Sequence, residues 1–276
     1  MCFGDIIYEG IREDEHGHYI LDTEFDFDED IIFLTNNTSG KGKVGNTEYY
    51  YGFEFNPKVK PNEQSKFRTA LKHKFKDESV FYNQEAERFV LEGLYRMDEM
   101  KNINDFEVVI STASTYGEET LTGLICQCIW ELAKDEAKVL NIQLIKEFCE
   151  NVIFDEDRAR EALAKTQRYG HSESELDSAI KSLKKQFEKA KAEGGLFKMK
   201  NYKPVAGRAG FINFLKFANE YDQKLYETLL AGTEVLICED FITSGSTVNE
   251  IIRFLNMFNP NTKISVFVLI NQLRNY

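Results

Sequence analysis

Long apolar runs, prolines and linker-like tracts are all scarce in this chain of 276 residues. No stretch approaches the run of about 18 apolar residues that a membrane-spanning helix needs. Proline occurs only 4 times, and no Gly/Ser or Pro tract marks a hinge, so we expect compact secondary structure. The first residues carry neither the basic nor the apolar segment of a secretory signal. These absences predict a cytoplasmic protein that does not contact a membrane.

Cysteine is also sparse, and its spacing excludes two kinds of site. The chain has 5 cysteines, an odd number, and none are spaced as Cys-x-x-Cys. That pattern supports neither a zinc site nor a disulfide framework. We therefore expect reduced, mostly buried thiols.

The chain carries more acidic than basic residues. Acidic residues number 46 against 34 basic ones, giving a formal net charge of −12. Such a chain repels the phosphate backbone of nucleic acids, which makes nucleic acid an unlikely partner. Hydrophobic residues make up 42% and charged residues 29%, values typical of soluble globular proteins, and the length suits one large domain or two.

The first 100 residues read as a β-rich region that ends in a helix. Short aromatic and β-branched pieces, such as 31–34 and 48–55, alternate with turn residues and predict antiparallel hairpins. From residue 83 to 100 the apolar residues recur at helical spacing. We therefore expect an N-terminal region over 1–100 and a separate core over 101–276.

The core region shows strands and helices in alternation. An apolar strand at 106–110 precedes a small polar stretch and a helix at about 118–137. A second strand at 234–238 leads, through a loop, into a helix that reaches about residue 257, and a final strand covers 264–270. This alternation predicts crossover units and an α/β fold with a parallel sheet.

A helical, mixed-charge insertion at about 155–208 separates the two units. Ser172 and Glu175 form a capping box that predicts the start of a helix, and Gly194 predicts its end. An earlier helix at 157–168 would complete an α-hairpin. The apolar stripe of the second helix is expected to pack on its own domain, with a homodimer contact as the alternative.

One segment, 235–247, combines features that suit a phosphorylated sugar. An apolar strand is followed by two adjacent carboxylates, Glu239 and Asp240, which can accept hydrogen bonds from neighbouring sugar hydroxyls. A loop of small residues then opens a helix, where a glycine lets the backbone approach a ligand and N–H groups favour a phosphate. The loop residues are Thr243, Ser244, Gly245, Ser246 and Thr247. Such a site lies where an open parallel sheet binds ligands, outside the carboxyl ends of its strands.

These thirteen residues resemble the phosphoribosyl-pyrophosphate (PRPP) signature of the type I phosphoribosyltransferases. The resemblance implies a parallel sheet of that kind, with the insertion as a hood that selects the acceptor and closes over the site. It implies that Glu239 and Asp240 are the catalytic residues, holding the ribose hydroxyls directly or through Mg²⁺. The loop from Thr243 to Thr247 would bind the 5′-phosphate. The family's pyrophosphate loop would correspond to Ser111, Thr112, Ala113, Ser114 and Thr115.

The implied function is Mg²⁺-dependent transfer of phosphoribosyl from PRPP to a nitrogen acceptor, with release of pyrophosphate, as in nucleotide metabolism. The alternative is a non-catalytic PRPP-binding regulator or sensor with the same fold. Thr243 stands where the hypoxanthine-guanine enzymes carry an aspartate, which implies that those two purines are poor acceptors. The end of the chain, from Asn271 to Tyr276, is similar to the competence-associated ComF-like branch.

Overall fold

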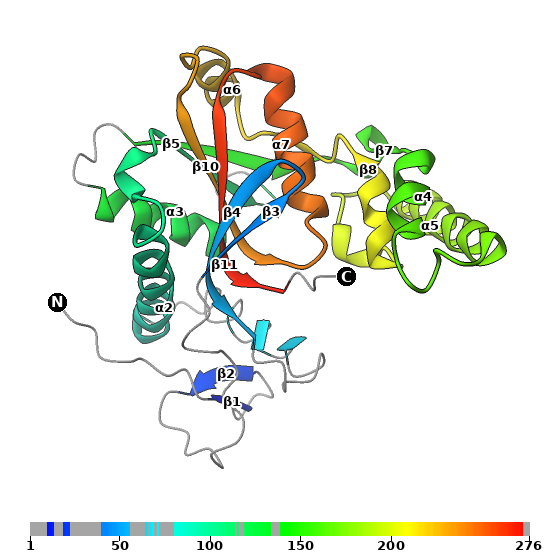
Figure 1. The fold of residues 1–276 in the computed structure, drawn as a ribbon, viewed down its shortest axis with the longest axis horizontal. Coiled ribbons are helices and arrows are strands. Elements are labelled where there is room, and N and C mark those ends of the chain that lie inside the picture. The colour runs from blue at the N-terminus through cyan, green and yellow to red at the C-terminus, as the bar shows by residue number, and fades with distance from the viewer. Residues whose placement is uncertain are drawn as a thin grey trace.

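The computed structural model describes residues 10–13, 19–22, 40–55, 64, 65, 67, 68, 71, 80–113, 115, 119–133 and 139–272. The strand expected at 31–34 lies outside these residues. Within them the chain folds around a seven-stranded sheet, flanked on one side by a helical lobe (Figure 1).

The seven-stranded sheet is mainly parallel, as the sequence predicts. Its strands follow the order β3-β4-β11-β10-β5-β6-β9, and the five inner strands run parallel. The edge strands β3 and β9 pair antiparallel with their neighbours. The strands are β3 (Gly40–Val44), β4 (Thr47–Glu54), β5 (Val108–Ala113), β6 (Leu140–Lys146), β9 (Leu215–Phe217), β10 (Glu234–Ile242) and β11 (Lys263–Asn271). Because the inner strands are parallel, their carboxyl ends meet at one edge of the sheet.

Helices cover both faces of the sheet, which explains why the central strands read as continuous apolar runs. Helices α2 (Val80–Asp98) and α3 (Leu121–Leu132) pack on one face, and α6 (Glu220–Glu227) and α7 (Ser246–Phe258) on the other (Figure 1). Alternate residues of β10 pack on the two faces of the sheet. Leu236 belongs to the apolar cluster with α2 and α3, and Ile237 to the cluster with α7.

The N-terminal strands belong to the central sheet. β4 pairs parallel with β11, and β3 and β4 form the expected antiparallel hairpin. Helix α2 lies close to β4, since a Cβ added at Gly52 would stand 2.6 Å from the Cα of Gly93. The division into regions 1–100 and 101–276 stays a prediction about domains, but the sheet itself runs across that boundary. A further pair, β1 (Gly10–Glu13) and β2 (Tyr19–Asp22), is antiparallel.

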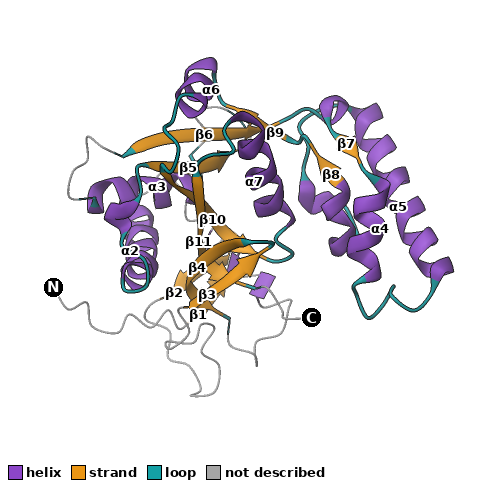
Figure 2. Cartoon of the chain, turned by 45° about the horizontal axis from the view of Figure 1, so that its top comes forward, coloured by secondary structure: helices purple, strands orange, loops and turns teal. Residues whose placement is uncertain are grey.

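The insertion forms a helical lobe beside the sheet, which we call the hood (residues 155–210; Figure 2). It contains α4 (Glu156–Ala164), α5 (Glu173–Glu193) and a 3-10 helix at Val205–Gly210. The short strands β7 (Ile153–Phe154) and β8 (Phe211–Ile212) pair at its base. The expected α-hairpin is present.

Helix α5 begins and ends as the sequence predicts. The Ser172 side chain accepts a hydrogen bond from the backbone N–H of Glu175, and Gly194 ends the helix at a φ of 72°. The apolar stripe of α5 is buried within its own chain, and Phe187 contacts the rings of Phe197 and Phe211. This packing confirms the first of the two expectations for the stripe.

Four of the five cysteines lie in described residues, and all four are buried free thiols, as expected. Cys2 lies outside those residues. None of the helices in the described ranges is long and apolar enough to cross a membrane.

Candidate functional site

The loop between β10 and α7 places the small residues of the motif at the start of a helix. Thr243 and Ser244 follow the strand, and Gly245 caps α7 with a φ of 69° and a ψ of 0°. This left-handed conformation favours glycine because a side chain there is strained. Ser246 and Thr247 are the first two residues of α7. The arrangement brings backbone N–H groups and hydroxyls to a helix N-terminus, where an anion is stabilised.

The loop is held by its own hydroxyls and by the last residue of β3. The Oγ atoms of Ser244 and Ser246 lie 2.9 Å apart within hydrogen-bonding distance. A Cβ added at Gly245 would stand 3.3 Å from the Cγ1 atom of Val44, so the two segments are in close contact. Val44 itself is buried. The β3–β4 hairpin therefore packs against the loop.

The two carboxylates lie in the last part of β10, which continues to Ile242. Glu239 is 7% exposed, whereas Asp240 is partly buried. The Oδ1 atom of Asp240 accepts a hydrogen bond of 2.7 Å from the backbone N–H of Phe241. Consecutive residues of a strand normally point to opposite faces, so Glu239 and Asp240 approach a ligand at the sheet edge from different directions.

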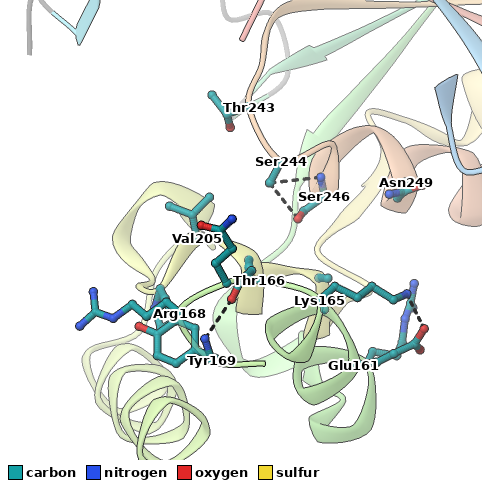
Figure 3. A pocket seen from close by; sticks show the side chains of 16 residues that line it. Glu161, Lys165, Thr166, Arg168, Tyr169, Val205, Thr243, Ser244, Ser246 and Asn249 are labelled. Carbon is teal, nitrogen blue, oxygen red and sulfur yellow. Dashed lines mark hydrogen bonds and ion pairs between the residues drawn. The ribbon is translucent and has the colours of Figure 1, made fainter. Parts of the chain in front are cut away.

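A cavity of about 720 Å³ separates the loop from the hood. Figure 3 shows Thr243, Ser244 and Ser246 on one wall, with Asn249 of α7 beside them. The opposite wall belongs to the hood. The hood residues that line the cavity are Arg158, Glu161, Ala162, Lys165, Thr166, Gln167, Arg168, Tyr169, Pro204, Val205, Ala206 and Ala209. The volume falls in the range of about 300–1,000 Å³ that is usual for small-molecule sites.

The hood wall combines apolar and aromatic surface with an excess of basic groups. Lys165 Nζ and Glu161 Oε1 lie 2.6 Å apart, and hydrogen bonding to Lys165 lowers the pKa of Glu161. The Arg168 guanidinium stands 5.3 Å from the ring centre of Tyr169. With Arg158 also on this wall, three cations face one carboxylate, so the cavity favours an anionic or electron-rich ligand.

The segment expected to form a pyrophosphate loop is in large part a strand. Ser111, Thr112 and Ala113 belong to β5 and are buried, so these three lie in a strand and not in a loop, and their role toward pyrophosphate stays a prediction. The strand continues through these small residues because they pair with β6, Ser111 with Gln143, Thr112 with Leu144 and Ala113 with Ile145. Thr115 is exposed in a bend after the strand, and Ser114 lies outside the described residues.

Four basic residues near the end of the hood differ in their surroundings. Lys198, Lys200 and Lys203 are exposed and do not line the cavity. Arg208 is different, because its side chain is partly buried and donates to the backbone oxygens of Tyr202 (2.8 Å) and Lys200 (3.0 Å).

The donor chemistry at the end of β10 fits a magnesium ion. Mg²⁺ prefers oxygen ligands and is usually held by one or two carboxylates together with water and substrate phosphates. Glu239 and Asp240 supply one carboxylate each, on opposite faces of β10, so either would hold an ion only together with water and substrate oxygens. The described residues contain no group of three or more His, Cys, Asp or Glu side chains that could hold a metal ion by themselves. Neither carboxylate lines the cavity.

Two supporting features of the site could be found only in part from sequence. Asn249 lies three residues after Ser246 on α7, and that spacing places both on one helix face. Val44, by contrast, is about two hundred positions away from the loop, and no local pattern links the two segments. The contribution of the β3–β4 hairpin is therefore a finding of the structure.

Comparison with known proteins bears on this geometry. Residues 207–276 match the family model of the phosphoribosyl transferase domain. A search of curated proteins found no match to the chain. The matched segment contains β10, the loop, α7 and β11, which together carry one wall of the cavity. Residues 207–276 are thus similar to the phosphoribosyl transferase domain, and this match, with the mainly parallel seven-stranded sheet, is consistent with the type I phosphoribosyltransferase family.

Proposed function

We propose that the protein transfers the 5-phosphoribosyl group of PRPP to a nitrogen nucleophile and releases pyrophosphate. One observation carries the proposal. The hydroxyls of Ser244 and Ser246, at the N-terminus of α7, form one wall of a cavity whose other wall is the hood. A sugar phosphate seated on the loop would thus meet a second substrate held by the hood.

The loop and the carboxylates have complementary tasks in this proposal. The loop from Thr243 to Thr247 binds the 5′-phosphate through its hydroxyls and backbone N–H groups. Glu239 and Asp240 accept hydrogen bonds from the ribose 2′- and 3′-hydroxyls, which fixes the orientation of the ring. The order of residues along the chain supports this division of tasks, because Phe241 and Ile242 separate the two carboxylates from the loop.

The bond changes define what the site must stabilise. The bond between ribose C1′ and the diphosphate oxygen breaks, and its electron pair leaves with pyrophosphate. The nitrogen lone pair forms the new bond to C1′, and the proton of that nitrogen passes to a base or to water. Positive charge develops on the sugar, as in glycoside chemistry, and the carboxylates at the sheet edge stabilise it.

Magnesium, when bound with PRPP, would neutralise charge on the departing diphosphate. The hood has a separate task, which is to exclude water, since hydrolysis of PRPP competes with transfer. Its apolar residues Val205, Ala206 and Ala209 face the cavity and suit that task. The aromatic ring of Tyr169 on the same wall suits a flat acceptor ring.

The experiment is a pyrophosphate-release assay with PRPP, magnesium and a panel of pyrimidine, pyridine and purine bases. Release that depends on one acceptor supports the proposal. Hypoxanthine and guanine should be poor acceptors, because Thr243 at the cavity wall cannot hold a proton as a carboxylate does. Tight PRPP binding without release for any acceptor would instead favour the regulator or sensor.

A matched pair of serine variants sharpens the assay. Ser244→Ala removes a hydroxyl from the cavity wall, whereas Ser178→Ala removes an exposed hydroxyl of α5 that bonds only within its own helix. The first should weaken binding of PRPP and of ribose 5-phosphate alike. The second should leave both unchanged. Equal behaviour of the two variants would argue against a phosphate site at the loop.

A further inference from the structure

Helix α7 begins in the loop proposed to bind phosphate, which we call the phosphate loop (residues 243–247), and it also contacts the base of the hood. It lies between the central sheet and the hood, next to the 3-10 helix at Val205–Gly210 (Figure 1). Ser246, in the first turn of α7, lines the cavity, and Glu250 follows one turn later on the same side of the helix. One helix therefore connects the phosphate loop with the hood.

Glu250 is a buried carboxylate that binds the base of the hood. Its side chain is only 2% exposed. The Oε1 atom accepts a hydrogen bond of 2.6 Å from the backbone N–H of Asn213, and both carboxylate oxygens accept from the Arg253 guanidinium at 2.7 Å. A buried charge is costly unless it is paired and hydrogen-bonded. The three bonds offset that cost and hold the carboxylate in one orientation.

Asn213 lies in the segment that links the hood to the central sheet. It stands between β8, at the base of the hood, and β9, the edge strand of the sheet. Its φ is 60°, in the left-handed region that asparagine tolerates better than most residues. Arg253 donates from Nη2 to the side-chain oxygen of Asn213 at 2.5 Å. Helix α7 thus binds both the backbone and the side chain of Asn213, and such contacts are what keep a residue in this conformation.

The other connection of the hood is held at the sheet edge. The backbone N–H of Glu147 donates to the oxygen of Phe214 at 2.9 Å, and its carboxylate lies 2.6 Å from Lys216 Nζ in β9. The segments that enter and leave the hood are therefore joined to each other. Glu250 and Arg253 add a link from these two segments to the helix of the phosphate loop.

We propose that Glu250 and Arg253 are positioning residues, which fix the hood wall of the cavity at a set distance from the phosphate loop. The inference rests on the proposed function, because it takes the two walls to hold two substrates that must meet. Ala209, on the hood wall, stands just before β8 and Asn213, so a displacement of this link moves the wall. A displacement of about 1 Å between reacting groups can cost about a hundred-fold in rate.

The plain alternative is that the pair only stabilises α7, and the experiment must separate the two. Glu250→Gln keeps the size of the side chain and one acceptor oxygen, but its amide nitrogen cannot accept a bond from Arg253. Arg253→Lys keeps the charge without the fork that reaches both Glu250 and Asn213. Glu92→Gln is the control, because Glu92 pairs with Arg96 at 2.9 Å on α2, which covers the other face of the sheet.

Hydrogen exchange without ligand measures the link itself. Exchange across residues 205–212 should be faster in Glu250→Gln than in the wild type, and the increase should exceed that in the central strand β5. Glu92→Gln should leave exchange across 205–212 unchanged. Wild-type exchange across 205–212 in Glu250→Gln would overturn the inference. An equal increase in both segments would also overturn it, since a loss of global stability alone predicts that result.

Kinetics measures the consequence for the reaction. In Glu250→Gln the kcat for transfer should fall on the order of ten- to a hundred-fold, and hydrolysis of PRPP should take a larger share of turnover because water enters. Binding of ribose 5-phosphate should stay unchanged, and Arg253→Lys should fall between Glu250→Gln and the wild type.

An unchanged kcat in Glu250→Gln would overturn the inference. A loss of ribose 5-phosphate binding as large as the loss of transfer would also overturn it, since damage to α7 itself predicts that result. A wild-type protein that transfers phosphoribosyl to no acceptor would overturn the proposed function instead. Faster exchange across 205–212 in Glu250→Gln would then still support the link between α7 and the hood.

Discussion

The substitution Gly245→Ala tests the geometry of the loop most sharply. Gly245 has a φ of 69°, and the left-handed conformation costs a residue with a Cβ roughly 1–2 kcal/mol. The new Cβ would also stand 3.3 Å from Val44 Cγ1, a contact that forces one of the two segments to move. Alanine lowers the entropy of the unfolded chain, which offsets about 0.4–1 kcal/mol of this cost. The strain less this offset is about 0–1.6 kcal/mol, and the contact with Val44 adds to this loss in the free energy of unfolding.

Gly232→Ala is the matched control. Gly232 has a φ of 88°, but a Cβ added there meets no atom within 4 Å, so the variant carries the backbone strain without the contact. Denaturant unfolding should show both variants destabilised, and Gly245→Ala more so. Calorimetry should show binding of ribose 5-phosphate weakened on the order of ten-fold in Gly245→Ala alone, because its loop can no longer hold the phosphate donors in place. Unchanged ribose 5-phosphate binding in Gly245→Ala would refute the assignment of the loop, and unchanged stability would refute the strain argument.

Three further predictions concern the carboxylates, the hood and a buried thiol. Glu239→Gln and Asp240→Asn should each weaken PRPP binding while inorganic phosphate binds as before, and calorimetry that shows no change for PRPP would remove their ribose role. Hydrogen exchange across residues 155–203 should slow when PRPP and magnesium are added. An exchange rate that does not change with the ligand would indicate that the hood is a static insertion. Burial raises the pKa of the Cys128 thiol from 9.0 to about 12, so the folded state keeps a proton that the unfolded chain loses above pH 9. The free energy of unfolding should therefore fall between pH 9 and 12, by up to about 1.4 kcal/mol per pH unit for this thiol, and less steeply in Cys128→Ala.

Sequence reasoning succeeded where short-range chemistry decides the structure. The capping box at Ser172 and Glu175 needs only four consecutive residues. Gly194 ends the helix because it adopts a positive φ, which favours glycine. The loop at 243–247 is similar, because a glycine and small hydroxyls specify a strand–turn–helix without help from distant segments. These features could be read from the chain directly.

Sequence reasoning failed where distant contacts decide the structure. The sequence predicts that the strand β5 ends before Ser111, but pairing with β6 continues it to Ala113. The division at residue 100 stays a prediction, but the sequence did not indicate that β4 pairs with β11, more than two hundred positions away. The hydrogen bond from Arg68 to Gln272 likewise joins residues that are far apart in the sequence. No local pattern predicts such pairs.

A crystal structure of the protein with PRPP and magnesium would test the central claim most directly. The account predicts the 5′-phosphate on the loop at Thr243 to Thr247, the ribose hydroxyls at Glu239 and Asp240, and the hood cavity open to the face of C1′. A PRPP molecule bound elsewhere, or with its 5′-phosphate away from the N-terminus of α7, would contradict the account.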